Sequence, residues 1–139
     1  MQLELTRSLR TGHDAIDADH AHIIDAINAI TREARTGGQP SVCHALMEEF
    51  IDTCAAHFRK EEEILAQAAY PALAEHSDCH NQMLEKARAA YQLCRTADDQ
   101  AAHLRHLEDV VSLLIDDIVR SDMAFVSYLQ AQGLARARP

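Results

Sequence analysis

Apolar residues recur at helical spacing along four long segments of the chain. In the first segment Ile16, Ile23 and Ile27 follow one another at intervals of seven and four, which places them on one face of an α-helix. Turn-forming residues separate the segments, such as the glycine pair at 37–38 and Pro71. The pattern predicts helices at about residues 17–36, 41–67, 71–95 and 98–131.

Capping residues indicate where these helices begin. We expect Ser41 to cap the second helix, and Thr96, with an acidic residue three positions later, to cap the fourth. Pro71 suits the first turn of the third helix. Residues 1–15 lack a full helical pattern and are expected to form an arm that packs through its leucines, whereas the final ARARP (135–139) is expected to fray.

The size and composition of the chain suit one all-α domain. Its 139 residues, 47% of them hydrophobic, can bury a single core of ordinary size, and we expect one helix bundle spanning 1–139. No apolar run approaches the roughly 18 residues of a membrane span, and the first residues lack a signal-peptide block. The expected location is therefore the cytoplasm. A net charge of -9 argues against nucleic acid as a partner and favours cations.

The four cysteines form no CxxC pair. Cys43, Cys54, Cys79 and Cys94 are expected to be small buried hydrophobes in a chain without an export signal. Because Cys79 lies between two histidines, a redox role at that position stays open.

Side chains able to bind metal share the apolar face of every predicted helix. His57 and Glu61 are four residues apart, so both project from one face of the second helix. The HSDCH segment (76–80) repeats this spacing with two histidines, and His20 lies on the apolar face of the first helix. The last helix carries two aspartates five positions apart, which converge only if they reach inward from either flank of the core-facing stripe.

A pair of metal ions would explain this placement. Burying unpaired imidazoles and carboxylates would cost several kcal/mol each. Imidazole and carboxylate are ligands that iron prefers, and bundle cores hold di-iron sites built in this way. The predicted ligands are His20, His57, Glu61, His76, His80, Asp117 and Asp122. Surface or ordinary core roles are expected for the remaining histidines (13, 22, 44, 103 and 106), and a solvated face for Glu62 and Glu63.

These motifs together resemble the hemerythrin family, specifically the single-domain bacteriohemerythrins. The resemblance covers nearly the whole chain and rests on GHDAIDADH (12–20), HFRKEE (57–62), YP (70–71), HSDCH (76–80) and DIVRSD (117–122), in the family's order. It implies an up-down-up-down four-helix bundle that holds an oxo- or hydroxo-bridged pair of iron ions and binds O2. Zinc or manganese could replace the iron.

The resemblance also implies a role for each residue at the site. His20 and His57 would hold the iron with the open coordination position, His76 and His80 would hold the second iron, and Glu61 and Asp122 would bridge the two. The apolar pocket over the open position would be lined by Ile23, Phe58, Leu113, Leu114 and Ile118.

The chain departs from the family pattern at two places. Leu5 and Leu113 stand where the family usually has tryptophan, and Asp117 stands where it has the third histidine of the second iron. Aspartate can still coordinate as an anionic oxygen ligand, and it lowers the net charge of the centre by one unit. The added anion favours ferric iron, so we expect faster autoxidation than in a relative with histidine there.

Three functions therefore compete. The leading one is a di-iron protein that binds O2 or another small diatomic molecule for storage, delivery or sensing, with any signalling or redox partner on a separate chain. The second is an enzyme, namely a di-iron oxidase, a peroxidase or a protein that handles nitric oxide, which the additional carboxylate favours. The third is an iron- or zinc-binding module without O2 chemistry.

Overall fold

The regular secondary structure of the described residues is α-helical. The computed structural model describes residues 10–37, 39–97 and 99–136, and within the last helix the side chains of 117–119 and 121–123 lie outside the description. In these ranges the chain forms four helices and no strand, which confirms the all-α class. The helices are α1 (Asp14–Arg35), α2 (Pro40–Gln67), α3 (Leu73–Arg95) and α4 (Gln100–Ala131).

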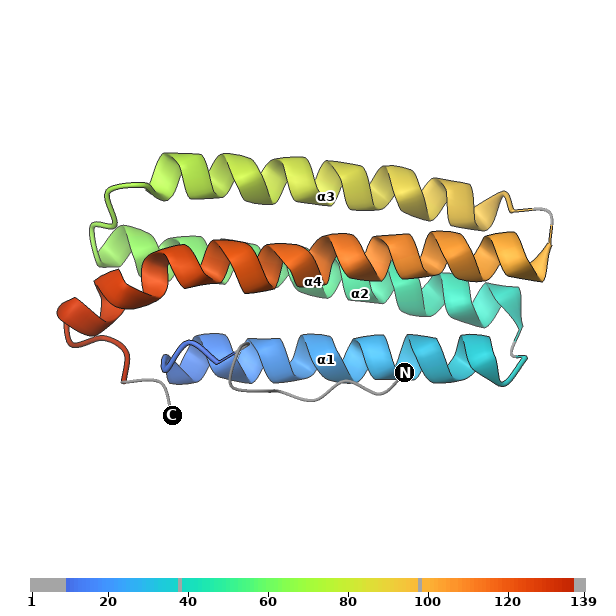
Figure 1. Ribbon diagram of the computed structural model, residues 1–139, viewed down its shortest axis with the longest axis horizontal. Coiled ribbons are helices and arrows are strands. Elements are labelled where there is room, and N and C mark those ends of the chain that lie inside the picture. Colours follow the sequence, from blue (N-terminus) through green and yellow to red (C-terminus); the bar gives the residue numbers. More distant parts are fainter. Residues whose placement is uncertain (1–9, 38, 98, 137–139) are drawn as a thin grey trace.

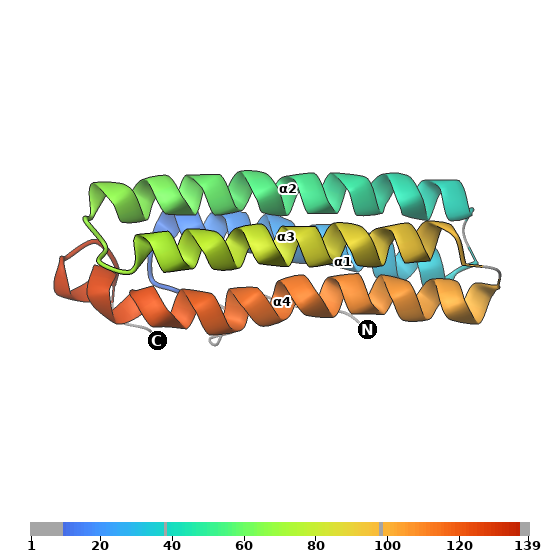
Figure 2. The same ribbon diagram turned by 90° about the horizontal axis from the view of Figure 1, so that it is seen from above.

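The helices lie side by side along one long axis, and the chain reverses at each connection (Figures 1 and 2). The α1–α2 and α3–α4 connections lie at one end of the bundle. The α2–α3 connection lies at the other end, together with the start of α1 and the end of α4 (Figure 1). None of the helices, over the described residues, is long and apolar enough to cross a membrane.

The apolar interior falls into two clusters along this axis. The larger cluster contains Ile23, Phe58 and Leu114 from α1, α2 and α4. The smaller cluster, toward the end with the α2–α3 connection, contains Leu65 and Phe125 together with Ile16. A polar layer separates the two on α1 and α2, because His20 and Glu61 are buried between members of the two clusters.

Two helices begin earlier than their sequence pattern predicted. The helix α1 begins at Asp14, because the ring nitrogen Nδ1 of His13 accepts a hydrogen bond from the backbone of Ile16 at 3.4 Å. The last two residues of the arm expected at 1–15 therefore belong to α1. Residues 1–9 of the arm lie outside the description. Ser41 does not cap α2: that helix begins at Pro40, whose missing N–H costs nothing in a first turn.

The other two helices begin later than predicted. Pro71 lies in the turn before α3, which begins at Leu73. Asp99, not Thr96, caps α4, since its carboxylate accepts from the backbone N–H of Ala102 at 2.7 Å. The Thr96 hydroxyl instead donates to the carbonyl of Gln92 at the end of α3. Asp99 is the nearer capping residue, and it takes the role.

The end of the described chain is bound to the start of α1, contrary to the fraying expected from residue 135. The backbone N–H of Arg136 donates to the carbonyl of Gly12 at 3.0 Å, and its guanidinium lies 2.6 Å from the Asp14 carboxylate. Gly12 has a φ of 86°, and a Cβ there would collide with the Arg136 carbonyl. The Asp17 carboxylate accepts from the backbone N–H groups of Thr11 and Gly12. The fraying prediction now concerns only 137–139, which lie outside the description.

Three of the four cysteines are buried as expected, and one is not. Cys43, Cys54 and Cys94 lie in the larger apolar cluster. Cys79 is exposed, because its position on α3 turns it away from the face that carries the flanking histidines.

Candidate metal centre

Five of the seven predicted ligands meet in the interior of the bundle. His20 comes from α1, His57 and Glu61 from α2, and His76 and His80 from α3, and all five are buried. They form two overlapping groups of three, in each of which the ligand atoms lie within 4.8 Å of one another. One group holds His20 and His57, the other holds His76 and His80, and Glu61 belongs to both.

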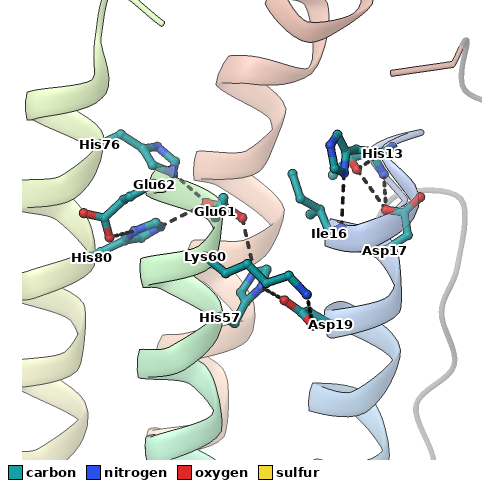
Figure 3. Close-up of polar contacts among 11 residues, drawn as sticks. His13, Ile16, Asp17, Asp19, His57, Lys60, Glu61, Glu62, His76 and His80 are labelled. Atoms are coloured by element: carbon teal, nitrogen blue, oxygen red, sulfur yellow. Dashed lines mark hydrogen bonds and ion pairs between the residues drawn. The ribbon is translucent and has the colours of Figure 1, made fainter. Parts of the chain in front are cut away.

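Glu61 lies between His57 on one side and the pair His76 and His80 on the other (Figure 3). Its Oε2 atom is 3.2 Å from Nε2 of His57. Its Oε1 atom is 2.8 Å from Nε2 of His76 and 3.3 Å from Nε2 of His80. Each carboxylate oxygen thus faces a different pair, which is how a carboxylate that bridges two cations is placed.

The Glu61 carboxylate is charged despite its complete burial. Burial alone would raise its pKa, but hydrogen bonds from His57, His76 and His80 outweigh this and hold the pKa well below the ordinary value of 4.5. The interior therefore contains a fixed negative charge surrounded by imidazoles, an environment suited to a cation.

Two further carboxylates hold the outer nitrogens of the histidine rings (Figure 3). Asp19 of α1 lies 3.2 Å from Nδ1 of His57, and Glu62 lies 3.0 Å from Nδ1 of His80. The Lys60 ammonium is 3.5 Å from Asp19, and the Ser77 hydroxyl donates to Glu62. Because an acidic acceptor holds the proton on Nδ1, each ring keeps Nε2 directed at Glu61 and available to a metal.

The sequence reasoning missed both of these carboxylates. Glu62 was expected on a solvated face, but it is half-buried against α3, whereas Glu63 is exposed as expected. Asp19 had no assigned role, although it directly precedes His20 and borders the apolar face. Both contacts cross between helices, so the spacing within a single helix gives no signal for them.

Aromatic rings enclose the histidines. Phe58 stacks on His80 with ring centroids 4.0 Å apart and an interplanar angle of 10°, and it also contacts His57. Phe125 and Tyr70 approach His76 edge-on. These contacts restrict ring rotation and exclude water from the centre.

The residues predicted to line an O2 pocket are only partly brought together. Ile23, Phe58 and Leu114 are buried in the same apolar cluster. Leu113 is half-exposed, and the side chain of Ile118 lies outside the description. A cleft of about 550 Å³ lies along α1 and α2 and reaches Asp19 and the outer side of His57, but none of the five predicted pocket residues lines it.

The remaining two predicted ligands, Asp117 and Asp122, are carried by α4, and their side chains lie outside the described residues. The helix itself passes the centre. Leu114, before them, lies in the cluster that contains Phe58, and Phe125, after them, has its ring centroid 5.4 Å from that of His76. Their ligand role stays a prediction.

The donor set fits a borderline transition metal. Four imidazoles around one shared carboxylate suit iron, zinc or manganese better than calcium or magnesium, which need oxygen-rich shells. Among the other histidines, His22 is exposed as expected and His13 caps α1. His44 and His103, expected in ordinary roles, lie beside each other at the far end of the bundle.

Comparison with known proteins agrees with this centre. The family model described as hemerythrin HHE cation binding domain matches residues 11–129. A bacteriohemerythrin of Stenotrophomonas maltophilia (strain R551-3) is 29% identical over 124 residues, which cover 88% of this chain and 78% of that protein. Bacteriohemerythrins of Pseudomonas paraeruginosa (strain PA7) and Pseudomonas aeruginosa (strain LESB58) are each 25% identical over 119 residues, covering 84% of this chain and 73% of theirs.

Proposed function

This chain belongs to the hemerythrin HHE cation-binding domain family, and from that premise we propose that it is a non-haem di-iron protein that binds O2. Its role would be oxygen storage, delivery or sensing in the cytoplasm, within the family's up-down-up-down bundle. The observation that carries the proposal is the position of Glu61, whose two oxygens face two separate histidine pairs.

The proposed ligand assignment follows these two pairs. His20 and His57 would hold one iron, His76 and His80 would hold the other, and Glu61 would be shared by both. Asp122 would add a second bridge and Asp117 a further ligand. The course of α4 supports this, since Leu114 and Phe125, which flank the two aspartates, both pack close to the centre.

The chain's own residues supply orientation and a dry environment. Asp19 and Glu62 hold the rings of His57 and His80 in position, and the apolar cluster that contains Ile23 and Phe58 keeps water away from one side. Bound ferrous iron would supply the O2-binding chemistry. A diatomic molecule needs only a small apolar space beside the iron.

Ferrous reconstitution without oxygen tests the proposal. We expect two irons per chain and a visible charge-transfer band that appears with O2 and disappears when O2 is removed. Glu61→Ala should lose most of the iron, whereas Glu63→Ala, two positions away and exposed, should bind iron as the unaltered protein does. A protein that binds iron but stays spectroscopically silent in O2 would contradict O2 binding.

One observation favours an enzyme as the second candidate. Asp117 occupies a position where the resemblance implies histidine, so the centre would be richer in carboxylate than an oxygen carrier's. Helix bundles do hold carboxylate-rich di-iron sites built from acidic side chains and histidines. Sustained turnover of peroxide or nitric oxide by the iron-loaded protein would favour this candidate, and stable uptake of zinc in place of iron would favour a metal-binding module.

The Asp117→His variant tests what the aspartate does. Replacing the anion by a neutral imidazole should favour ferrous iron, so we expect the O2-loaded state to decay more slowly by about tenfold or more, which corresponds to roughly 1.4 kcal/mol. Stopped-flow absorbance after mixing with O2 measures the decay. Asp116→His, on the exposed neighbour, is the control, and equal lifetimes in the unaltered protein and Asp117→His would contradict the expectation.

A further inference from the structure

A second group of metal-binding side chains lies at the opposite end of the bundle. His44 of α2, Cys94 at the end of α3 and His103 near the start of α4 have ligand atoms within 4.8 Å of one another. We call these three residues the distal cluster. The rings of His44 and His103 have centroids 5.3 Å apart.

The distal cluster is separate from the metal centre described above. His44 precedes His57 by 13 positions on the same helix, which corresponds to roughly 20 Å along the axis at about 1.5 Å per residue. The larger apolar cluster fills the space between, with Met47, Phe50 and Cys54 buried on α2. No ligand can belong to both sites.

The buried imidazole of His103 indicates a binding site at this position. This side chain is only 7% exposed, and neither of its ring nitrogens has a hydrogen-bond partner among the described residues. Nε2 of His44 is likewise buried and without a partner there. Buried polar atoms in folded proteins are nearly always bonded, so two histidines with three such nitrogens at one place need an explanation.

We propose that His44, Cys94 and His103 bind a transition-metal ion of borderline or soft character, zinc(II) or copper(I). Two imidazoles and a thiolate are the donor set that such ions prefer. Metal–ligand bonds of about 2.0 to 2.3 Å place tetrahedral ligand atoms roughly 3.5 Å apart, so the present cluster needs only small side-chain rotations to close on an ion.

Metal binding replaces the proton on the Cys94 sulfur by the metal ion. The Cys94 S–H bond breaks, the sulfur bonds to the ion, and the proton leaves to solvent with no change of oxidation state. Before binding the thiol is neutral, since burial and, secondarily, the neighbouring Cys43 raise the pKa of Cys94. Cys43 precedes His44 in the chain, is buried, and lies close enough to Cys94 to raise its pKa, so it is the candidate for a fourth ligand.

A metal at this position would fasten three helices together. Cys94 and His103 lie on either side of the α3–α4 connection, and His44 adds α2, so the ion would close the end of the bundle away from the iron. Tyr91 already links α3 to α2 here, because its hydroxyl donates to the carbonyl of His44 and to Glu48. The expected consequence is a structural role, with greater thermal stability of the metal-bound form.

Cobalt(II) added to the iron-loaded protein tests the proposal, because cobalt replaces zinc and is spectroscopically visible. We expect one additional equivalent per chain, with a thiolate-to-cobalt charge-transfer band. Cys94→Ser should abolish the band, and His103→Leu should lower cobalt affinity at least tenfold. His106→Leu, which removes a half-buried histidine one turn further along α4, should leave both unchanged. Iron content should be the same in all variants.

Two further measurements on the unaltered protein test the proposal even if a variant folds poorly. X-ray absorption of the zinc-loaded unaltered protein should show one sulfur and at least two nitrogen neighbours, or two sulfurs if Cys43 also binds. Titration with copper(I) against a chelator then decides between the two ions. The proposal is overturned if the unaltered protein takes up no metal beyond its iron, or if the zinc has no sulfur neighbour.

Discussion

His57 and His80 are held by carboxylates on both sides, and this arrangement decides how well each ring can bind a metal. Nε2 of each ring faces Glu61, and Nδ1 faces Asp19 or Glu62. An acceptor behind a ligating histidine fixes its orientation and raises its basicity. Asp19 and Glu62 should therefore matter for the metal although neither reaches it.

Asp19→Ala tests this at α1. Without the acceptor, the His57 ring is free to rotate and to carry its proton on the wrong nitrogen, so we expect iron affinity to fall by about 10- to 100-fold. Competition with a ferrous chelator measures the change. Asp25→Ala removes an exposed acid that lines the same cleft and is the matched control, and equal affinities in the two variants would show that Asp19 does not position His57.

At the residue scale, the sequence predicted only those parts of the centre that lie on one helix. The pairs His57/Glu61 and His76/His80 could be identified because a spacing of four places both members on one face. Asp19 and Glu62 could not, because their partners lie on a neighbouring helix and the relative rotation of two helices is not encoded in either pattern alone. His44 and His103 were missed for the same reason.

At the scale of the elements, helix positions followed from periodicity, but helix starts did not. The apolar faces of α1 and α2 are where the sequence placed them, because every apolar residue on a face, such as Ile23 or Phe58, favours burial in the same direction. A start depends on one side chain competing for a few free N–H groups. Asp99 caps α4 in place of the predicted Thr96, and His13 caps α1, for which no cap was predicted.

The segment before α1 gives a prediction at this scale. Gly12→Ala should destabilise the protein by more than about 1 kcal/mol, since the backbone there has positive φ and the added Cβ meets the carbonyl of Arg136. Urea unfolding of the metal-free protein measures the loss. Gly37→Ala separates the two causes, because Gly37 also has positive φ but nothing within 4 Å of the added atom. A loss in Gly12→Ala no larger than in Gly37→Ala would mean that the contact with the chain end contributes nothing.

At the scale of the whole molecule, the centre interrupts the apolar interior. His20, Glu61 and His80 are buried where a bundle would otherwise continue with apolar side chains. Such a layer weakens the metal-free bundle, because a charged carboxylate and several imidazoles have lost their contact with water. The sequence indicated this conflict directly, since polar residues stood in register with apolar stripes, and a bound cation would resolve it.

The stability of the protein should therefore depend on its metal. Cations at this centre would be held by α1, α2 and α3 together in the folded chain and would have no comparable site in the unfolded one, so loading should add roughly 4 kcal/mol when free metal is about 1,000 times the dissociation constant. We expect the urea midpoint of the iron-loaded protein, measured without oxygen, to fall clearly after the iron is removed by a chelator. In Glu61→Ala, which lacks the shared ligand, the loaded and chelated samples should unfold together. Equal midpoints for the loaded and metal-free unaltered protein would mean that the buried histidines stabilise the bundle by themselves, and the physical reason for placing a metal among them would be lost.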